Sequence, residues 1–212
     1  MKTFSKSKSL RYAGNRVKLF SIPEFLTFTI REFNLDSVNL ICKINNKFSN
    51  HIVAIRSSAK DEDTKNNSAA GEYESVLNIP SDNTERIIES INIVIASYEK
   101  KRQLLSDDEV IIQEMVKNPT MSGVIFTHDL NTGAPYYVIN YDDQSGTTDT
   151  VTSGNGEYAN RTLYIHRNSI GKLRSERFIK LLQAVQELEQ VMNSKFLDIE
   201  FALDENLTPY LL

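Results

Sequence analysis

Arg56 stands near the end of a short β-branched segment, IVAIRS (52–57), and two serines follow it. An arginine beside hydroxyl groups at the end of a strand can bind a phosphate through charge-assisted hydrogen bonds. The alternative is an ion pair with Glu62 or Asp63 that holds the polar stretch after the strand. Taken without any further information, the residues favour this structural interpretation of Arg56.

Asp198 and Glu200 alternate along an otherwise apolar segment, FLDIEFALD (196–204). In a strand, alternate residues point to the same face, so the two carboxylates are predicted to share one. Two carboxylates on one face of an apolar strand are costly unless they are paired or bind a metal ion. Mg²⁺ takes carboxylates together with nucleotide phosphates. A salt bridge to a nearby lysine or arginine explains the pattern equally well, and both interpretations stay open.

A third candidate is the segment VIIQEMV, in which an apolar strand ends in Gln113, Glu114, Met115 and Val116. The backbone groups of such a strand could face the edge of an adenine base, and Met115 could pack on the ring. By itself, however, the pattern is more typical of a core strand followed by a hairpin. The residues alone favour the core strand.

Lys6 lies in a serine-rich segment, KSKSL (6–10), close to the N-terminus. A lysine in a serine-rich turn before a helix can meet a phosphate as a point charge. A basic N-terminal tail is the commoner meaning of such a sequence. Lys6 alone is therefore a weak indication of a phosphate site.

The elements that position these residues are predicted from apolar periodicity and turn residues. Thr29 and Glu32 form a possible capping box, T-x-x-E, where a helix would begin. Polar loops are expected over 60–72 and 142–160. Together the elements predict an α+β fold with mostly antiparallel strands. Strands are expected over 24–28, 52–57, 74–79, 110–115, 122–128, 135–141, 162–167, 196–204 and 208–212, and helices over 38–48, 84–100 and 175–193.

Composition limits the class of protein. The chain has 212 residues, a formal charge of −4 and 40% hydrophobic residues, values typical of a globular protein. Mild acidity argues against nonspecific nucleic-acid binding, and no apolar run approaches the roughly 20 residues of a membrane helix. The single cysteine, Cys42, excludes an internal disulfide and is predicted to lie in the core. A reduced, cytoplasmic compartment is the expectation.

Three blocks together resemble one family, the N-terminal nucleotide-binding domain of phosphoenolpyruvate synthase and pyruvate phosphate dikinase. The family pattern V-A-V-R-S-S-A-x-x-E-D…A-G-x-x-x-T-x-L-N appears here as VAIRSSAKDED…AGEYESVLN. The pattern V-x-V-Q-x-M-V…S-G-V-x-F-T-x-D-P-x-T-G appears as VIIQEMVKNPTMSGVIFTHDLNTG, and D-I-E-W-A-x-D…Y-x-L appears as DIEFALDENLTPYLL. The order and spacing of the blocks match over about 50–212.

The sequence also departs from this family at several points. The family's G-G-K-G-x-x-L becomes FSKSKSL, which contains Lys6, and its G-L-G-E-x-V-V-x-G becomes GTTDTVTSG, with Asp149 in place of the glutamate. The basic helix end of the family is reduced to Lys100, Lys101 and Arg102. The motif of the phosphocarrier domain, G-G-x-T-S-H, is absent. The chain stops at Leu212, before the family's final glutamine and arginine, so the last strand is expected to be truncated.

The resemblance implies an ATP-grasp-like α+β fold, with two subdomains of mainly antiparallel sheets around a nucleotide cleft. The expected division is an N-terminal subdomain, 1–105, with the phosphate-binding Lys and Arg loops, and a C-terminal grasp subdomain, 106–212. The implied activity is that of an ATP-dependent phosphotransferase, or kinase. It would move a phosphoryl group from Mg-ATP to a carrier histidine on a domain absent from this chain. Pyruvate or another small molecule would be the final acceptor, with no nucleic-acid or membrane partner.

Site residues follow from the resemblance by position. The catalytic residues would be Lys6, Arg56 and Glu200, with Glu200 meeting Mg²⁺ or the ribose. The nucleotide-binding residues would be Gln113, Glu114, Met115 and Val116 around the adenine, Lys101 at the phosphates and Asp149 as a further polar contact. Two alternatives remain: a non-catalytic nucleotide-binding or regulatory module fused to another enzyme, and a small-molecule ligase of the wider ATP-grasp class.

Overall fold

A computed structural model describes residues 5–58, 73–101, 103–148 and 161–212. The chain divides into two compact units. The first consists of Met1–Ser9 and Pro23–Met115, and the second of Leu10–Ile22 and Val116–Leu212. The division between them therefore passes through the first helix, α1 (Lys6–Gly14).

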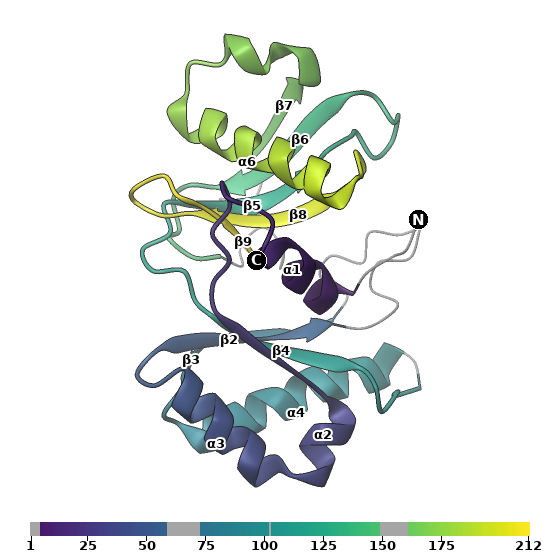
Figure 1. Ribbon diagram of the computed structural model, residues 1–212, viewed down its shortest axis with the longest axis vertical. Helices are drawn as coiled ribbons and strands as arrows, with labels where there is room; N and C mark the ends of the chain where they lie inside the picture. The colour runs from purple at the N-terminus through teal and green to yellow at the C-terminus, as the bar shows by residue number, and fades with distance from the viewer. Residues whose placement is uncertain (1–4, 59–72, 102, 149–160) are drawn as a thin grey trace. The chain divides into compact units, whose positions relative to one another are not determined.

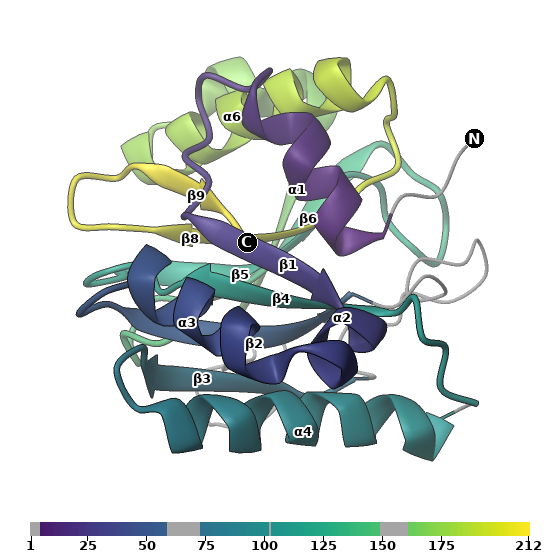
Figure 2. The same cartoon turned by 60° about the horizontal axis from the view of Figure 1, so that its bottom comes forward.

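The first unit contains a four-stranded antiparallel sheet in the order β1-β4-β2-β3. Three helices, α2, α3 and α4, supply side chains to one apolar core together with strand residues such as Val53, Ile55 and Val110. In that core α4 packs against β2 and β3 (Figure 2). The strands are β1 (Phe25–Thr29), β2 (Ile52–Ser58), β3 (Ser75–Pro80) and β4 (Glu109–Glu114), and the helices are α2 (Ile30–Leu35), α3 (Ser37–Lys47) and α4 (Thr84–Lys101).

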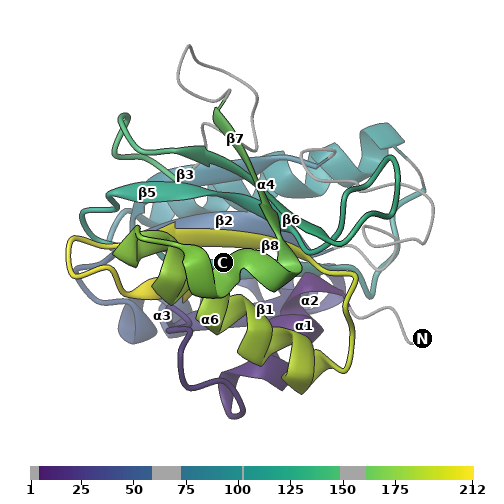
Figure 3. The same ribbon diagram turned by 90° about the horizontal axis from the view of Figure 1, so that it is seen from above.

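The second unit contains a five-stranded antiparallel sheet in the order β7-β6-β5-β8-β9. Helix α6 lies along this sheet (Figures 1 and 3), and the Phe178 ring meets the Tyr141 ring edge-on at 5.4 Å. The elements are β5 (Met121–Phe126), β6 (Tyr136–Asp142), β7 (Arg161–His166), the 3₁₀ helix η1 (Arg167–Lys172), α6 (Glu176–Met192), β8 (Asp198–Leu203) and β9 (Pro209–Leu211).

Local sequence explains two of the junctions. The Thr29 hydroxyl accepts a hydrogen bond from the Glu32 backbone N–H at 3.1 Å, and the Glu32 carboxylate accepts one from the Thr29 backbone N–H at 2.6 Å. This confirms the predicted capping box at the start of α2. In the turn between β5 and β6, the Asp129 carboxylate accepts hydrogen bonds from the next residues, and Gly133 has a positive φ of 68°. Hydrogen bonds from Thr132 also lower the pKa of Asp129.

The predicted α+β class with antiparallel sheets is confirmed, as are the expected strands and helices, whose ends agree to within two residues. Two elements were not expected, namely α1 and η1. The predicted loop over 60–72 and most of the one over 142–160 lie outside the described residues.

The predicted core position of Cys42 is wrong, because its side chain is exposed. Helix α3 buries Ile41 and Ile44, and a residue directly after Ile41 is turned by about 100° away from that face. Val38, near the start of the same helix, is also exposed, at 76%.

The two units also differ from the expected division at 105/106. Strand β4 belongs to the first unit because it pairs with β1 and β2. The segment Leu10–Ile22 joins the second unit, in which Ser21 forms a parallel bridge with Tyr210 of β9. Both differences arise from pairing between segments far apart in the sequence.

Candidate functional site

Arg56 and Gln113 meet directly on one face of the first sheet. In β2 the core-facing residues are Val53 and Ile55, so Arg56 lies on the opposite face, which it shares with Gln113 of β4. The Arg56 guanidinium Nη1 donates a hydrogen bond to the Gln113 side-chain oxygen at 3.3 Å. Arg56 is 9% exposed and Gln113 is 2% exposed. The structure thus brings together two residues that were predicted separately.

The contact with Arg56 fixes the orientation of the Gln113 side-chain amide. A guanidinium group donates hydrogen bonds and accepts none, so the amide oxygen must face Arg56 and the NH₂ group must face away. That nitrogen, Nε2, is buried and has no hydrogen-bond partner among the described residues. An unpaired buried donor is destabilising by about 1–3 kcal/mol, which favours a bound acceptor at this position.

Thr27 of β1 lies near Gln113 on the same face. Thr27 is paired with Ile111 and Gln113 with Phe25, so the two polar residues are diagonal neighbours across the β1–β4 ladder. The Thr27 hydroxyl is also buried without a hydrogen-bond partner in the described part of the chain. Sequence reasoning missed Thr27, and its only signal was a threonine alternating with apolar residues. Two unsatisfied polar groups therefore lie on one face of the first sheet.

The residues after Gln113 lie at the end of β4. The Glu114 and Met115 backbone N–H groups already donate to the Glu24 and Ile52 carbonyls, at 2.8 and 2.9 Å. The Glu114 carboxylate lies 3.7 Å from His51 Nδ1, and both side chains are partly exposed. Val116, which is 8% exposed, is the residue at which the chain passes from the first unit into the second. The backbone N–H groups of Glu114 and Met115, which were predicted to face a base, are therefore already hydrogen-bonded within the protein.

Lys6 is the first residue of α1 and is half-buried, whereas the sequence suggested a turn before a helix. The next residue, Ser7, is fully buried and donates its backbone N–H to the Ser58 hydroxyl at 3.0 Å. Ser58 and Arg56 lie two residues apart on the same face of β2. The structure therefore ties the start of α1 to the end of the strand that carries Arg56.

Glu200 lies in the second unit, on the central part of β8, where it pairs with Val124 of β5. Its neighbours Ile199 and Phe201 are buried, whereas Glu200 is half-buried and Asp198 is exposed. The alternation confirms that Asp198 and Glu200 share a face of this strand. Among the described residues, no group of three or more His, Cys, Asp or Glu side chains is placed to hold a metal ion by itself.

Two predicted residues remain outside this arrangement. Lys101 is the exposed last residue of α4, and Asp149 lies outside the described residues. The predicted partners of Arg56 in an ion pair, Glu62 and Asp63, also lie outside them.

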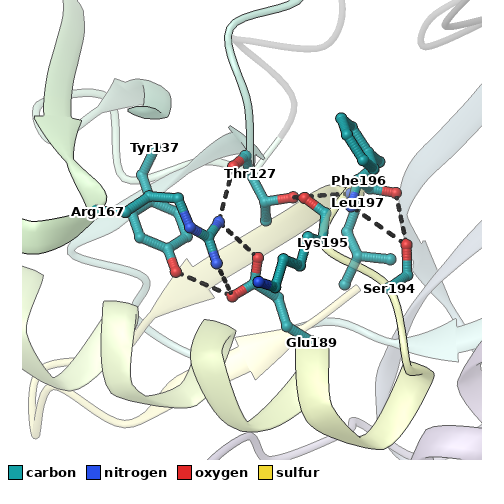
Figure 4. Close-up of polar contacts among 8 residues, drawn as sticks. All are labelled: Thr127, Tyr137, Arg167, Glu189, Ser194, Lys195, Phe196 and Leu197. Atoms are coloured by element: carbon teal, nitrogen blue, oxygen red, sulfur yellow. Dashed lines mark hydrogen bonds and ion pairs between the residues drawn. The ribbon is translucent and has the colours of Figure 1, made fainter. Parts of the chain in front are cut away.

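A separate polar cluster in the second unit joins η1, β6 and α6 (Figure 4). Arg167 makes a two-pronged contact with Glu189, with both nitrogen-to-oxygen distances at 2.7 Å. The Tyr137 hydroxyl donates to the same carboxylate at 2.9 Å, and Arg167 also donates to the Thr127 carbonyl at 2.9 Å. Burial raises the pKa of Tyr137 to about 12, with smaller contributions from its hydrogen bond to Glu189 and from the charge of that carboxylate. The Tyr137 hydroxyl therefore stays a donor at neutral pH.

This cluster borders a polar cavity of about 620 Å³, whose lining includes Arg167, Glu189 and Lys195. None of the residues predicted for nucleotide binding lines that cavity. The cluster also gave no signal in the sequence, because its members are separated by up to 62 positions. Only Thr127 lies in a family block, and it joins the cluster through its backbone carbonyl. We therefore interpret the cluster as structural.

Solved structures with a similar fold include two amino-acid ligases. D-alanyl-alanine synthetase A from Vibrio cholerae O1 biovar eltor str. N16961 matches with a TM-score of 0.53 and 17% identity over 99% of this chain and 53% of that one. VanG D-Ala:D-Ser ligase from Enterococcus faecalis matches with a TM-score of 0.50 and 12% identity over 97% of this chain and 50% of that one. The chain thus spans about half the length of these two ligases.

PH1788 from Pyrococcus horikoshii Ot3 matches with a TM-score of 0.54 and 15% identity over 99% of this chain and 88% of that one. At these identities the similarity shows the fold alone. Comparison with curated protein sequences found no match.

The two antiparallel α+β units and these structural neighbours define an ATP-grasp-like fold. Residues 8–143 match the family described as pyruvate phosphate dikinase, AMP/ATP-binding domain. The chain belongs to this family, which confirms the resemblance inferred from the three sequence blocks, and it is an ATP-binding domain. No helix in the described residues is long and apolar enough to cross a membrane.

Proposed function

We propose that this chain is the nucleotide-binding part of an ATP-dependent phosphotransferase that passes a phosphoryl group from Mg-ATP to a carrier histidine on another domain. In that step the bond between the transferred phosphorus and the nucleotide oxygen breaks. A new bond forms between the phosphorus and an imidazole nitrogen of the carrier. A small molecule such as pyruvate then accepts the phosphoryl group. Family membership supports the use of ATP, and the rest is our proposal.

The observation that carries this proposal is the buried Gln113 amide. Its NH₂ group is turned away from Arg56, is buried and lacks an acceptor among the described residues. An adenine ring offers such acceptors in its ring nitrogens. A donor fixed before the ligand arrives loses little orientational freedom on binding, which favours affinity. Met115, half-buried two residues further on, would supply an apolar contact to the ring.

Phosphoryl transfer relies mainly on positioning and on neutralising phosphate charge. We assign the charge neutralisation to Lys6 and Arg56, with Lys101 and Asp149 as additional contacts. A guanidinium has five N–H donors, and one of those of Arg56 contacts Gln113. We assign a phosphate contact to the same guanidinium group.

Glu200 is our candidate ligand for the Mg²⁺ that accompanies ATP. Magnesium in nucleotide sites is held by one or two carboxylates together with phosphate oxygens and water, so the absence of a larger ligand group among the described residues fits this ion. Bound there, the ion would neutralise phosphate charge. Glu200 would orient it, while Asp198 serves a structural contact.

The test is a calorimetric titration of the chain with ATP, with and without Mg²⁺. We expect binding that magnesium tightens. The substitution Glu200→Gln should reduce the magnesium effect about tenfold, or about 1.4 kcal/mol, because a neutral amide is a poorer ligand for a hard cation. Binding of metal-free ATP should barely change.

Asp198→Asn is the matched control, since it removes the other carboxylate from the same face of β8. It should leave the magnesium effect intact. A magnesium effect lost in Asp198→Asn and kept in Glu200→Gln would reverse the assignment. No ATP binding by the unsubstituted chain would contradict the proposed function itself.

The second candidate function is a regulatory nucleotide-binding module without catalysis. It is favoured by the altered lysine loop, where Ser7 replaces the family's glycine and is buried in hydrogen bonds. The two functions differ in one outcome. Phosphorylation of a histidine on an added carrier domain of the family supports the transferase, whereas ATP binding without that transfer supports the regulatory module.

A further inference from the structure

Ser7 is fully buried although it is a polar residue in the first turn of α1. Its exposed fraction is 0%, its backbone N–H donates to the Ser58 hydroxyl at 3.0 Å, and its own hydroxyl donates to the Glu109 carboxylate. The first N–H groups of a helix have no partner within the helix, so the Ser58 hydroxyl satisfies one of them. Both ends of the Ser7 residue, backbone and side chain, are thus fixed to the first sheet.

Tyr98 of α4 closes these contacts into a ring. It is also 0% exposed, and its hydroxyl accepts from the Ser58 backbone N–H at 2.8 Å and donates to the Glu109 backbone carbonyl at 2.7 Å. Ser7, Ser58, Tyr98 and Glu109 together form a closed hydrogen-bonded ring, which we call the Ser7–Glu109 ring. Its members come from α1, β2, α4 and β4. A buried polar network whose members are satisfied makes the surrounding elements rigid.

The ring lies next to the residues assigned to phosphate. Lys6 directly precedes Ser7, and Arg56 is two residues before Ser58 on the same face of β2. Holding Ser7 against Ser58 therefore fixes the distance between the backbone positions of Lys6 and Arg56. All of these residues belong to the first unit.

Two of the ring members are not accounted for by the family blocks. The family pattern has glycine where Ser7 stands, and a glycine has no hydroxyl to reach Glu109. Glu109 lies before the V-x-V-Q block and was assigned no role from the sequence. With serine in place of glycine, this position gains the contact with Glu109. It also avoids the residue that loses most conformational freedom on folding.

We propose that Glu109 and Tyr98 are positioning residues that hold the Lys6 turn of α1 against the end of β2, so that Lys6 and Arg56 meet the nucleotide phosphates together. This inference rests on the proposed function. It concerns the phosphates and not the base, because the ring fixes the turn that carries Lys6, whereas the Gln113 amide is oriented by its own hydrogen bond with Arg56, outside the ring.

The experiment compares ATP with adenosine by calorimetry on the whole chain. Glu109→Ala should weaken ATP binding about tenfold and change adenosine binding by less than about twofold, since the base contact is separate. Glu109→Gln should restore most of the ATP affinity, because its amide oxygen still accepts from Ser7. Asp107→Ala, which removes a 56%-exposed carboxylate nearby, is the matched control and should leave both affinities unchanged.

Tyr98→Phe provides a second variant that removes a single hydroxyl from the ring, and it should show the same selective loss for ATP. Equal losses for ATP and adenosine, or no loss in either variant, would overturn the positioning role while leaving ATP binding in place. Failure of the unsubstituted chain to bind either ligand would overturn the proposed function and this inference together. These outcomes separate the two claims.

Discussion

Replacing Glu189 with alanine is expected to lower the free energy of unfolding of the second unit by about 3–5 kcal/mol, the range for breaking one half of a buried ion pair. Glu189 is 7% exposed and accepts hydrogen bonds from Arg167 and Tyr137 (Figure 4). Its removal leaves the Arg167 guanidinium, with a side chain 18% exposed, without its carboxylate. Urea unfolding followed by circular dichroism measures the change.

Glu176→Ala is the control on the same helix. Glu176 is 70% exposed and pairs with Lys180 one turn further on, so its loss should be below about 1 kcal/mol. Replacing both members of the buried pair with apolar residues, Arg167→Met with Glu189→Leu, should recover much of the stability, because neither charge is then left buried. A loss below about 1 kcal/mol for Glu189→Ala would show that the cluster is not a structural contact.

The second large effect is expected at Gly123, in the S-G-V motif of β5. A Cβ atom there would lie 2.0 Å from the Asn140 backbone oxygen and 2.8 Å from the Tyr141 Cα. Because these are backbone atoms of the paired strand β6, the clash cannot be relieved by a side-chain rotation. Gly123→Ala should destabilise the second unit by about 3 kcal/mol or more, at or beyond the usual upper end for overpacking. Thermal unfolding is the measurement.

Gly171→Ala is the matched control, since nothing lies within 4 Å of its added Cβ atom. Its melting temperature should stay close to that of the unsubstituted chain. If Gly123→Ala melts at the same temperature as Gly171→Ala, the close approach of β5 and β6 is not the reason that the S-G-V motif has glycine at position 123.

Local patterns in the sequence were sufficient to predict most of the fold. Helices α4 and α6 carry apolar residues at helical spacing, and the Thr29 capping box marks the start of α2. The predicted burial of Cys42 was wrong because an apolar run was interpreted as uniformly buried, whereas one face of α3 is exposed. Helix α1 was missed because KSKSL has few apolar residues.

The site was only partly predictable. Arg56 and Gln113 were both identified, but their hydrogen bond joins residues 57 positions apart, and no local pattern indicates it. The same holds for Ser7 and Glu109, which are 102 positions apart. Thr27 and Tyr98 have no motif at all. Family resemblance provides the residue types of a site, whereas the pairing of distant strands decides which of them meet.

The most direct test of the central claim is the side-chain NH₂ signal of Gln113 in a nuclear magnetic resonance titration with Mg-ATP. If this buried donor binds the nucleotide, its resonances should shift with added Mg-ATP and saturate at the affinity measured by calorimetry. Signals of Gln103, outside the proposed site, should not move. Saturated binding with an unmoved Gln113 amide would contradict the account.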